Sequence, residues 1–387
     1  MTSSPYKLLI GDNRELLRKL PTGLVQCAIT SPPYYKQRDY GTGMWEGGDA
    51  DCDHRRKHGN KQGNPEFCHP RDLEIASADD FFPDVCGKCG AVKGADLQSG
   101  REETPEEYIA NQVVTCRELR RVLRDDGTFW YNIGEKYENK QMLAMPWRVA
   151  LALQADGWLL RSDIIWKKPN AMPSSQRDRP SCNHEYIFLF TKGPKYYYDD
   201  VAIREPSTSD DEGMRTKRSV WTVPVAREKA AHFAVFPPDL IEPCVLAGTS
   251  EKGCCPKCHA PIVRQTEEDR VATRPGRDTK LKLSENKHRE ANGMQSAKST
   301  PASVAGNRDP ERHITHIRTV GWAPSCSCDA GDPIPCVVLD IHAGSGTTLA
   351  VAVNHHRRAI GLELNPDNVP IIHDKVSRAK YTAGFKL

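Results

Sequence analysis

The last part of the chain holds the feature that most constrains the fold, a glycine-rich turn between an apolar strand and an apolar helix. The run Cys336-Val-Val-Leu-Asp340 is typical of a buried strand, and Leu349-Ala-Val-Ala-Val353 of a helix. Between them lies Gly344-Ser345-Gly346-Thr347-Thr348, and a second apolar run, Ala359–Glu363, follows. A strand, a glycine turn, a helix and a strand are the repeating parts of an α/β fold with a parallel sheet.

The same turn predicts a ligand that contains a ribose. Glycines let the backbone approach a ligand closely, and Glu363 follows the turn by about 20 residues, where nucleotide-binding folds place an acid on the ribose hydroxyls. No Lys follows Gly346, and the third glycine of the pyrophosphate fingerprint is missing. A ligand with a ribose but no phosphate fits best, and a tight strand-to-helix turn without a ligand is the alternative.

A second motif, Thr30-Ser31-Pro32-Pro33-Tyr34, follows the apolar run Val25–Ile29 near the start of the chain. Its two prolines make a rigid turn and remove two backbone donors. An exocyclic amine of a base is a poor nucleophile, but Ser31 Oγ and the Pro32 carbonyl could accept its two N–H bonds and localise its lone pair. Tyr34 could stack on a base that has left the duplex. The alternative is an ordinary Pro-Pro turn with Tyr34 as packing.

The rest of the chain alternates between helices and strands outside two polar stretches. Thr104-Pro105-Glu106-Glu107 is a capping box that predicts a helix up to Asp126-Gly127, and residues 128–133 read as a buried strand. A second helix and strand run from Pro146 to Trp166. This alternation favours a mostly parallel sheet that is interrupted by insertions at residues 49–101 and 249–335. We expect the second insertion to be partly disordered from Gln265 to Arg312.

Cysteines cluster in both insertions. The N-terminus lacks the pattern of a signal peptide, so we expect a cytoplasmic protein, in which clustered cysteines indicate metal rather than disulfides. The pairs Cys255/Cys258 and Cys326/Cys328 have the spacing of a tetrahedral zinc site. A weaker set is Cys52, His54, Cys86 and Cys89, with Cys68 and His58 as alternative ligands. We predict two structural zinc sites; free thiols are the alternative.

The two motifs together resemble the beta group of DNA amino-methyltransferases, in which the catalytic loop precedes the cofactor loop. Ile164–Asn170, His184–Phe188 and His232–Pro237 are similar to that family too. The resemblance implies an α/β, Rossmann-like methyltransferase sheet, mostly parallel, with circularly permuted motif order. The cysteine spacings add two small zinc-binding insertions to this fold. The resemblance also implies methyl transfer from S-adenosylmethionine to an amine by direct attack. The implied catalytic residues are Ser31, Pro32, Pro33 and Tyr34, and the implied cofactor residues are Asp12, Phe233, Asp340, His342, Gly344, Ser345, Gly346, Thr347, Thr348 and Glu363.

Several of these assignments have alternatives. Asp12 also suits a helix cap, and Phe233 also suits a core position. His342 stands where the family usually has Phe, so an imidazole replaces the ring expected on the cofactor's adenine. Ser31 favours cytosine N4 as the target, with adenine N6 as the alternative.

On this basis the chain divides into seven segments. These are 1–48 with the catalytic loop, 49–101 as a zinc-binding insertion, 102–205 as the continued methyltransferase domain, 206–230 as a target-recognition segment, 231–248 as a cofactor-site segment, 249–335 as a zinc-ribbon insertion, and 336–387 as the cofactor-binding part.

The expected partner is double-stranded DNA, and a cognate restriction enzyme is a candidate partner. The net charge is only +3, so phosphate contacts must be local. The best candidates lie in the loop after Trp166: Lys167, Lys168, Asn170, Gln176, Arg177 and Arg179. No stretch is apolar enough for a membrane span. A catalytically inactive zinc-stabilised DNA-binding protein, and a methyltransferase of RNA or protein amides, are the competing hypotheses.

Overall fold

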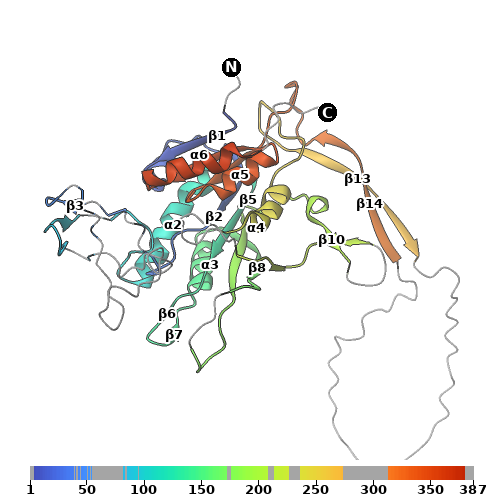
Figure 1. Ribbon diagram of the computed structural model, residues 1–387. Coiled ribbons are helices and arrows are strands. Elements are labelled where there is room, and N and C mark those ends of the chain that lie inside the picture. The colour runs from blue at the N-terminus through green and yellow to red at the C-terminus, as the bar shows by residue number, and fades with distance from the viewer. Residues whose placement is uncertain are drawn as a thin grey trace, which may run out of the picture.

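The computed structural model describes residues 4–38, 40, 42–43, 45–49, 51–52, 54, 82, 85–94, 96–171, 176–207, 213–225, 236–272 and 313–379. Its centre is an eight-stranded sheet (Figure 1). The strands lie in the order β1 (Tyr6–Ile10), β16 (Arg358–Glu363), β15 (Val337–Asp340), β2 (Val25–Thr30), β5 (Leu123–Ile133), β9 (His184–Thr191), β8 (Leu159–Lys167) and β12 (Val220–Thr222).

The sheet is mostly parallel, as the sequence predicts. Strand β9 runs antiparallel to both of its neighbours, β5 and β8, and the remaining pairings of this sheet are parallel. Every residue of β2 is buried, which explains its unbroken apolar run, because a parallel strand is covered on both faces.

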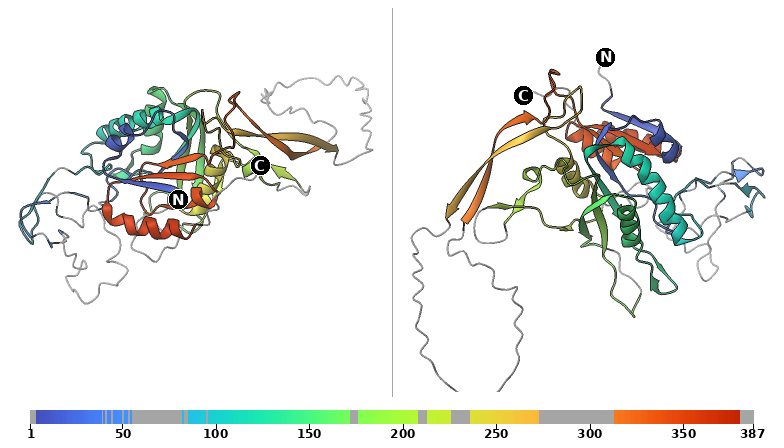
Figure 2. Two further views of the ribbon diagram at one scale, coloured as in Figure 1. Left: turned by 90° about the horizontal axis from the view of Figure 1, so that it is seen from above. Right: turned by 180° about the vertical axis from the view of Figure 1, so that it is seen from behind.

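Helices cover the two faces of the sheet in two sets (Figure 2). One set is α1 (Asn13–Arg18), α2 (Pro105–Val122) and α3 (Met145–Ala155), whose buried side chains share one core with Phe129, Phe188 and Phe190. The other set is α4 (Pro238–Gly248), α5 (Thr347–Asn354) and α6 (Val369–Ser377), which pack around a second core. The chain is therefore an α/β/α sandwich.

The predicted capping box of α2 is present. Thr104 Oγ1 accepts a hydrogen bond from the Glu107 amide at 3.2 Å, and the Glu107 carboxylate accepts one from the Thr104 amide at 3.3 Å. The helix ends at Val122, before the predicted stop at Asp126-Gly127, because Leu123 is already extended and begins β5. Burial of Leu123 in the sheet core decides this boundary.

The two polar stretches differ in structure. The first contains the short pair β3 (Trp45–Glu46) and β4 (Val92–Lys93). The second contains a long antiparallel ribbon of β13 (Ile262–Ala272) and β14 (His313–Pro324), which projects from the body in Figure 1. Residues 265–272, which we expected to begin a disordered stretch, thus continue a strand; residues 273–312 lie outside the described part of the chain.

Smaller pairs complete the fold: β6 (Tyr137–Glu138) with β7 (Gln141–Met142), and β10 (Glu205–Pro206) with β11 (Met214–Arg215). None of the helices within the described ranges has the length and apolar character needed to cross a bilayer.

Candidate active site

The site lies where the chain reverses its direction of travel across the sheet. From β15 the chain passes through α5 to β16 on one side, and from β2 it passes through α2 to β5 on the other, so β15 and β2 flank a topological switch point. Ligands of open α/β sheets bind in the crevice at such a point, beyond the carboxyl ends of the strands. A cavity of about 700 Å³ lies there, a size typical of small-molecule sites.

The cavity brings together most of the predicted catalytic and cofactor residues. Those that line it are Asp12, Ser31, Pro32, Pro33, Tyr34, His342, Gly344, Ser345, Thr347 and Glu363. Gly346 supports the turn with φ of +80°, and a side chain there would meet Ile372 at 3.0 Å. Phe233 lies outside the described residues, but its neighbour Phe236 lines the cavity.

Glu363 has the hydrogen bonding expected of a ribose ligand. Its Oε1 accepts from the Asn365 amide at 2.9 Å and from Asn368 Nδ2 at 3.0 Å, and Oε2 accepts from the Gly344 amide at 2.7 Å. The Leu364 amide also donates to this carboxylate. Oε2 thus lies at the glycine turn, where a ribose hydroxyl would bind, and burial raises the pKa of Glu363.

Asp340 lies beneath the cavity instead of in its wall. It is 1% exposed and accepts hydrogen bonds from Thr30 Oγ1 at 2.8 Å, from Thr348 Oγ1 at 2.7 Å and from the His342 amide at 3.0 Å. Burial raises its pKa to about 7. Asp340 and Thr348 thus fasten the glycine turn to the end of β2, and direct contact with a cofactor is not the role that this placement favours.

His342 does reach the cavity and is held at both ring nitrogens. Asn13 Nδ2 donates to Nε2 at 2.9 Å, so Nδ1 carries the proton and donates to Thr30 Oγ1 at 3.2 Å. Burial lowers the pKa of His342 to about 4. The ring is therefore neutral and fixed in orientation at the position where the family usually has Phe.

Ser31 and Tyr34 belong to a polar group at the other end of the cavity. Ser31 Oγ donates to Tyr34 Oη at 3.2 Å, and Tyr34 Oη donates to Glu185 Oε2 at 2.7 Å. Burial and the Glu185 carboxylate raise the pKa of Tyr34 well above its usual value, so the phenol stays protonated. The Tyr34 ring packs closely on Gly134, where an added Cβ would meet Cε2 at 2.6 Å.

Sequence reasoning did not place Glu185, Asn132 or Lys168 in this group. Glu185 and Asn132 were not assigned, and Lys168 was assigned to DNA phosphates. In the structure Lys168 Nζ forms an ion pair with Glu185 and lies 4.4 Å from the centre of the Trp166 ring, and all three line the cavity. The signal was present in His184-Glu185-Tyr186, a segment similar to the family.

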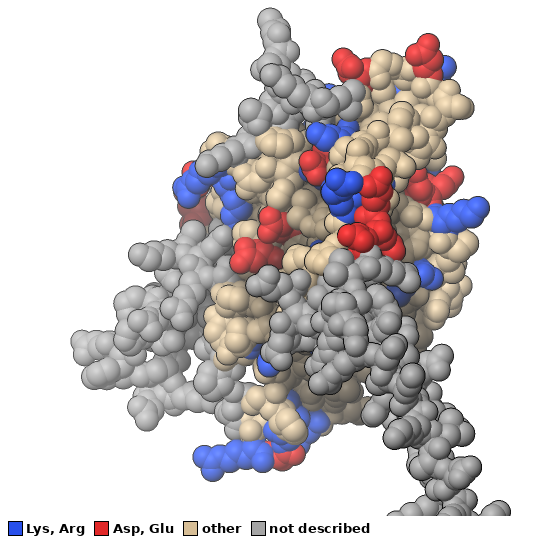
Figure 3. Space-filling view, turned by 90° about the vertical axis from the view of Figure 1, so that its right-hand side faces the viewer, with Lys and Arg blue, Asp and Glu red and all other residues tan. Residues whose placement is uncertain are grey.

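The other predicted DNA-contact residues lie in varied surroundings. Lys167, Gln176 and Arg177 are exposed. Arg179 lies 3.6 Å from the centre of the Tyr137 ring, and Asn170 exchanges hydrogen bonds with the backbone of Val225. In Figure 3, which shows another face, the described basic and acidic side chains are interspersed. That face does not carry the uniform positive charge that favours phosphate binding.

Asp12 caps a helix and also lines the cavity. It caps α1 by accepting the Arg14 amide at 2.7 Å, and the Arg14 guanidinium pairs with it at 2.7 Å. The cap and this ion pair lower its pKa against the effect of burial. Asp12 also lines the cavity, so the cap does not exclude contact with a cofactor.

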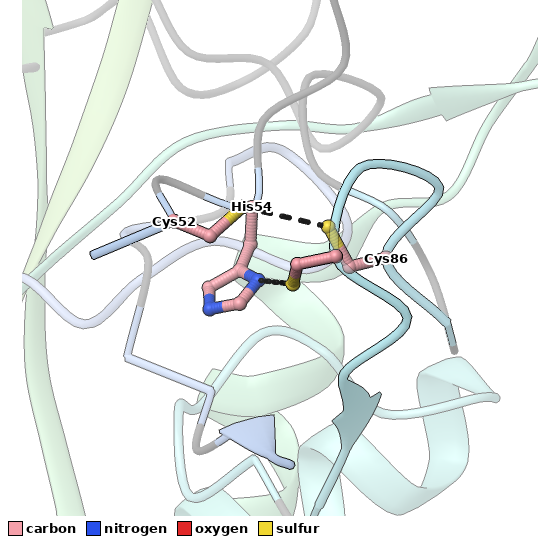
Figure 4. A group of neighbouring side chains, drawn as sticks. Cys52, His54 and Cys86 are labelled. Carbon is pink, nitrogen blue, oxygen red and sulfur yellow. Dashed lines mark hydrogen bonds between the residues drawn. The ribbon is translucent and has the colours of Figure 1, made fainter. Parts of the chain in front are cut away.

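Both predicted cysteine clusters assemble in space. The ligand atoms of Cys52, His54, Cys86 and Cys89 lie within 4.8 Å of one another, and so do those of Cys255, Cys258, Cys326 and Cys328. In the first cluster Cys52 Sγ and Cys86 Sγ are 3.8 Å apart, and Cys89 Sγ and His54 Nδ1 are 3.6 Å apart (Figure 4). Tetrahedral zinc would require about 3.8 Å between sulfurs and about 3.6 Å between sulfur and nitrogen, given its usual bond lengths.

Each cluster contains a backbone turn of the same kind, and this turn presents two of its cysteines. The Cys86 amide donates to the Ala91 carbonyl at 2.8 Å and the Gly90 amide to the Cys86 carbonyl at 2.8 Å. In the second cluster the Cys255 amide donates to the Ala260 carbonyl at 2.8 Å and the His259 amide to the Cys255 carbonyl at 2.9 Å. Each turn is a knuckle that holds two thiolates side by side, as a metal site needs. His58 and Cys68, the alternative ligands, lie outside the described residues.

Comparison with known proteins agrees with this geometry. The sequence profile of a family described as DNA methylase matches residues 25–255 and 332–374, which leaves the ribbon outside the match. The chain is 36% identical over 271 residues to the Type II methyltransferase M.XycI of Xanthomonas campestris pv. cyanopsidis, covering 62% of this chain and 72% of that protein. It is 34% identical over 276 residues to M.SmaI of Serratia marcescens, covering 64% and 76%.

Among solved structures, the PvuII DNA methyltransferase (cytosine-N4-specific) has a similar fold. The TM-score is 0.51 at 15% sequence identity, and the alignment covers 96% of this chain and 88% of that one. The profile match spans most of the chain, and the fold and motif order agree with it. The chain therefore belongs to the DNA methylase family, as a beta-class amino-methyltransferase of the N6/N4 group.

Proposed function

We propose that this protein transfers a methyl group from S-adenosylmethionine to the N4 amine of cytosine in duplex DNA. The observation that carries the proposal is one continuous cavity with Ser31 at one end and the Gly344 turn and Glu363 at the other. A carboxylate beside a glycine turn whose sequence has no Lys directly after Gly346, unlike a P-loop, fits this cofactor. When bound, the cofactor supplies a methyl group on a positively charged sulfur.

The amine end of the cavity fits direct attack without a covalent enzyme intermediate. Ser31 Oγ and the Pro32 carbonyl accept the two N–H bonds of the amine and localise its lone pair toward the methyl group. As the nitrogen–carbon bond forms and the sulfur–carbon bond breaks, the amine must lose one proton. Ser31 is linked through Tyr34 to the carboxylate of Glu185, which offers an acceptor for that proton.

The position of these groups inside a cavity supports base flipping. A base stacked in a duplex cannot reach atoms beyond the carboxyl ends of buried strands, so the target nucleotide must leave the helix. The exposed residues Lys167, Gln176 and Arg177 then serve as contacts to the DNA around the extruded base. By analogy with the Type II methyltransferases, we also propose that the enzyme acts at a specific sequence, with a cognate restriction enzyme as its partner.

The test combines nucleoside analysis with a catalytic variant. DNA from cells that express the wild-type protein should contain N4-methylcytosine. Ser31→Ala should lower methyl transfer by about 100-fold or more, the usual scale for a lost acid–base or hydrogen-bonding group, while cofactor binding in calorimetry stays within about twofold, since Ser31 lies at the amine end. Ser377→Ala, at the end of α6, is the control.

Each contrary outcome identifies a separate error. N6-methyladenine in place of N4-methylcytosine would move the target to adenine. Undiminished transfer by Ser31→Ala would remove the role of the loop. No transfer by the wild type to duplex DNA, RNA or protein would favour the inactive DNA-binding protein.

We also propose that the two cysteine clusters hold structural zinc. The match between the first cluster and a tetrahedral site, and the knuckle turns of both, support this proposal. Elemental analysis of the purified chain should give two zinc ions per chain. A folded protein without zinc would contradict both sites.

A further inference from the structure

Part of the cavity wall comes from the first insertion rather than from the sheet. Asp96 and Gln98 line the cavity, together with Arg38, Tyr40 and Thr42, which come before the insertion. The insertion is therefore part of the site, and the question is what holds it in place.

Gln98 holds two residues of the loop that precedes the insertion, Arg38 and Tyr40, through their backbone atoms. The side-chain Oε1 accepts the Tyr40 amide at 2.7 Å, and Nε2 donates to the Arg38 carbonyl at 2.9 Å. Gln98 is only 5% exposed, and its own amide donates to Asp96 Oδ1 at 3.0 Å. Two hydrogen bonds from one buried side-chain amide thus fix the backbone positions of Arg38 and Tyr40 at the cavity.

Tyr40 also contacts the end of the cavity that holds Glu363. Asn365 Nδ2 donates to the Tyr40 carbonyl at 3.4 Å, and the Asn365 amide donates to Glu363 Oε1 at 2.9 Å. Tyr40 is therefore linked through Asn365 to the carboxylate that we assign to the ribose, so a shift of Tyr40 changes the cofactor end first.

Asp96 is connected through a series of contacts to the first cysteine cluster. Asp96 pairs with Lys93 at 3.3 Å, with both side chains at most 12% exposed. Lys93 belongs to β4, which pairs with Trp45 of β3, and the Trp45 ring stacks on His54 at 4.3 Å. His54 is one of the four ligands, and Cys86 and Cys89 directly precede β4.

Among the described residues, few apolar side chains hold this insertion, although Gln112 Nε2 of α2 donates to Ser99 Oγ at 2.6 Å. Cys86 and Ala91 are buried, but Val85, Val92 and Leu97 are each more than half exposed. A segment this small cannot form a core of its own, and a metal that crosslinks it supplies the missing stability.

We propose that zinc at the Cys52/His54/Cys86/Cys89 site organises the cofactor wall of the cavity, with Gln98 as the positioning residue between metal and loop. This inference rests on the proposed function, because the ligand of the wall is S-adenosylmethionine. Metal at this site sets cofactor affinity, although no metal ligand touches the cofactor.

The second cluster provides a matched control within the same chain. Gln26 Nε2 donates to the His259 carbonyl at 3.4 Å, and the Arg124 guanidinium donates to the Cys258 carbonyl. Gln26 and Arg124 are near the amino ends of β2 and β5, whereas the cavity lies beyond the carboxyl ends. The second cluster thus lies at the amino ends of these strands, away from the cavity at their carboxyl ends. The contacts described above link only the first cluster to the cavity wall.

The experiment measures zinc content and cofactor affinity in the full-length protein. Cys89→Ala should lose one zinc per chain and raise the dissociation constant for S-adenosylmethionine in calorimetry by about tenfold or more, since the wall is no longer preorganised. Cys258→Ala should also lose one zinc but keep the wild-type constant within about twofold. Gln98→Ala should keep both zinc ions and weaken cofactor binding as Cys89→Ala does.

Two further readouts separate positioning from general damage. The maximal rate of methyl transfer at saturating cofactor should change less than about threefold in Gln98→Ala, since Ser31 and Glu185 are untouched. The double variant Cys89→Ala/Gln98→Ala should bind no more weakly than the weaker single variant, because both changes cut the same chain of contacts.

The proposal fails if Cys89→Ala loses zinc but binds the cofactor normally, if Gln98→Ala binds normally, or if Cys258→Ala is weakened to the same degree. If Cys89→Ala does not fold, Gln98→Ala still decides, because it leaves every metal ligand in place. A wild-type protein that binds no S-adenosylmethionine would instead contradict the proposed function.

Discussion

At the scale of single residues, the unusual feature of this site is the line of polar contacts that crosses beneath the cavity. It runs from Asn13 through His342 and Thr30 to Asp340, with each group hydrogen-bonded to the next. His342 and Thr30 each have a hydrogen-bond partner on both sides, and the line ends at the buried carboxylate of Asp340. His342 is therefore a fixed part of the wall, and its imidazole offers a flat neutral face where the family usually has the ring of Phe.

Protonation of His342 should oppose folding. Its pKa is about 4 in the folded chain, because of burial, and about 6.5 in an unfolded one. The unfolded state thus binds more protons between these values, and stability falls as the pH drops from about 6.5 toward 4. From pH 7.5 to 5 this histidine should cost about 2 kcal/mol of unfolding free energy.

The variant His342→Phe has no titrating imidazole at this position, so its unfolding free energy lacks this pH dependence. Urea unfolding at pH 7.5 and pH 5 should show that the wild type loses about 2 kcal/mol more than the variant over this interval. The raised pKa of Asp340 acts in the opposite direction, but it is common to both proteins because the residue 342 amide still donates to it. An identical pH dependence of the two proteins would show that the ring is not buried as a neutral imidazole.

At the scale of elements, a buried ion pair contributes to the attachment of the ribbon of β13 and β14. Arg264 Nε lies 3.0 Å from both carboxylate oxygens of Asp199, and these side chains are 14% and 3% exposed. The Arg264 guanidinium also covers the Trp322 ring of the opposite strand, at 4.3 Å from its centre. The pair thus joins both strands of the ribbon to the segment before α4.

Removal of one partner should be costly. Asp199→Ala leaves the buried Arg264 with Glu251 at 3.3 Å as its remaining acidic partner among the described residues. This change should lower the unfolding free energy by about 3 kcal/mol, the usual scale for breaking a buried pair. Glu267→Ala breaks the exposed pair with Arg318 on the same ribbon and should cost under about 1 kcal/mol. Urea unfolding of both variants measures the difference; equal losses would contradict a docking role for Asp199.

At the scale of the whole molecule, the chain builds one cavity from segments that lie far apart in sequence. Ser31 comes from the end of β2, Glu185 from β9 and Glu363 from β16. The parallel arrangement of β1, β16, β15, β2 and β5 turns their carboxyl ends toward one edge, so the catalytic loop and the cofactor loop meet although more than 300 residues separate them. The permuted order of the motifs in the sequence does not change which strand ends meet at the cavity.

Much of this organisation can be predicted from the sequence. Apolar runs, the capping box at Thr104, the glycine turn at Gly344 and the cysteine spacings depend on neighbouring residues, so local patterns reveal them. The resemblance to a family then relates the Ser31 loop to the Gly344 turn. The class of fold, the family and the members of both cysteine clusters followed from such signals.

The tertiary structure alone decided which residues face one another. Glu185 and Tyr34 are 151 positions apart, and no local pattern predicts that the carboxylate and the phenol meet. Packing likewise places Lys168 at the cavity and not on the predicted DNA surface, and it buries Asp340 beneath the cavity and not in its wall. The physical reason is that periodicity and turn chemistry act over a few residues, whereas the register of the sheet and the burial of charge depend on the whole chain.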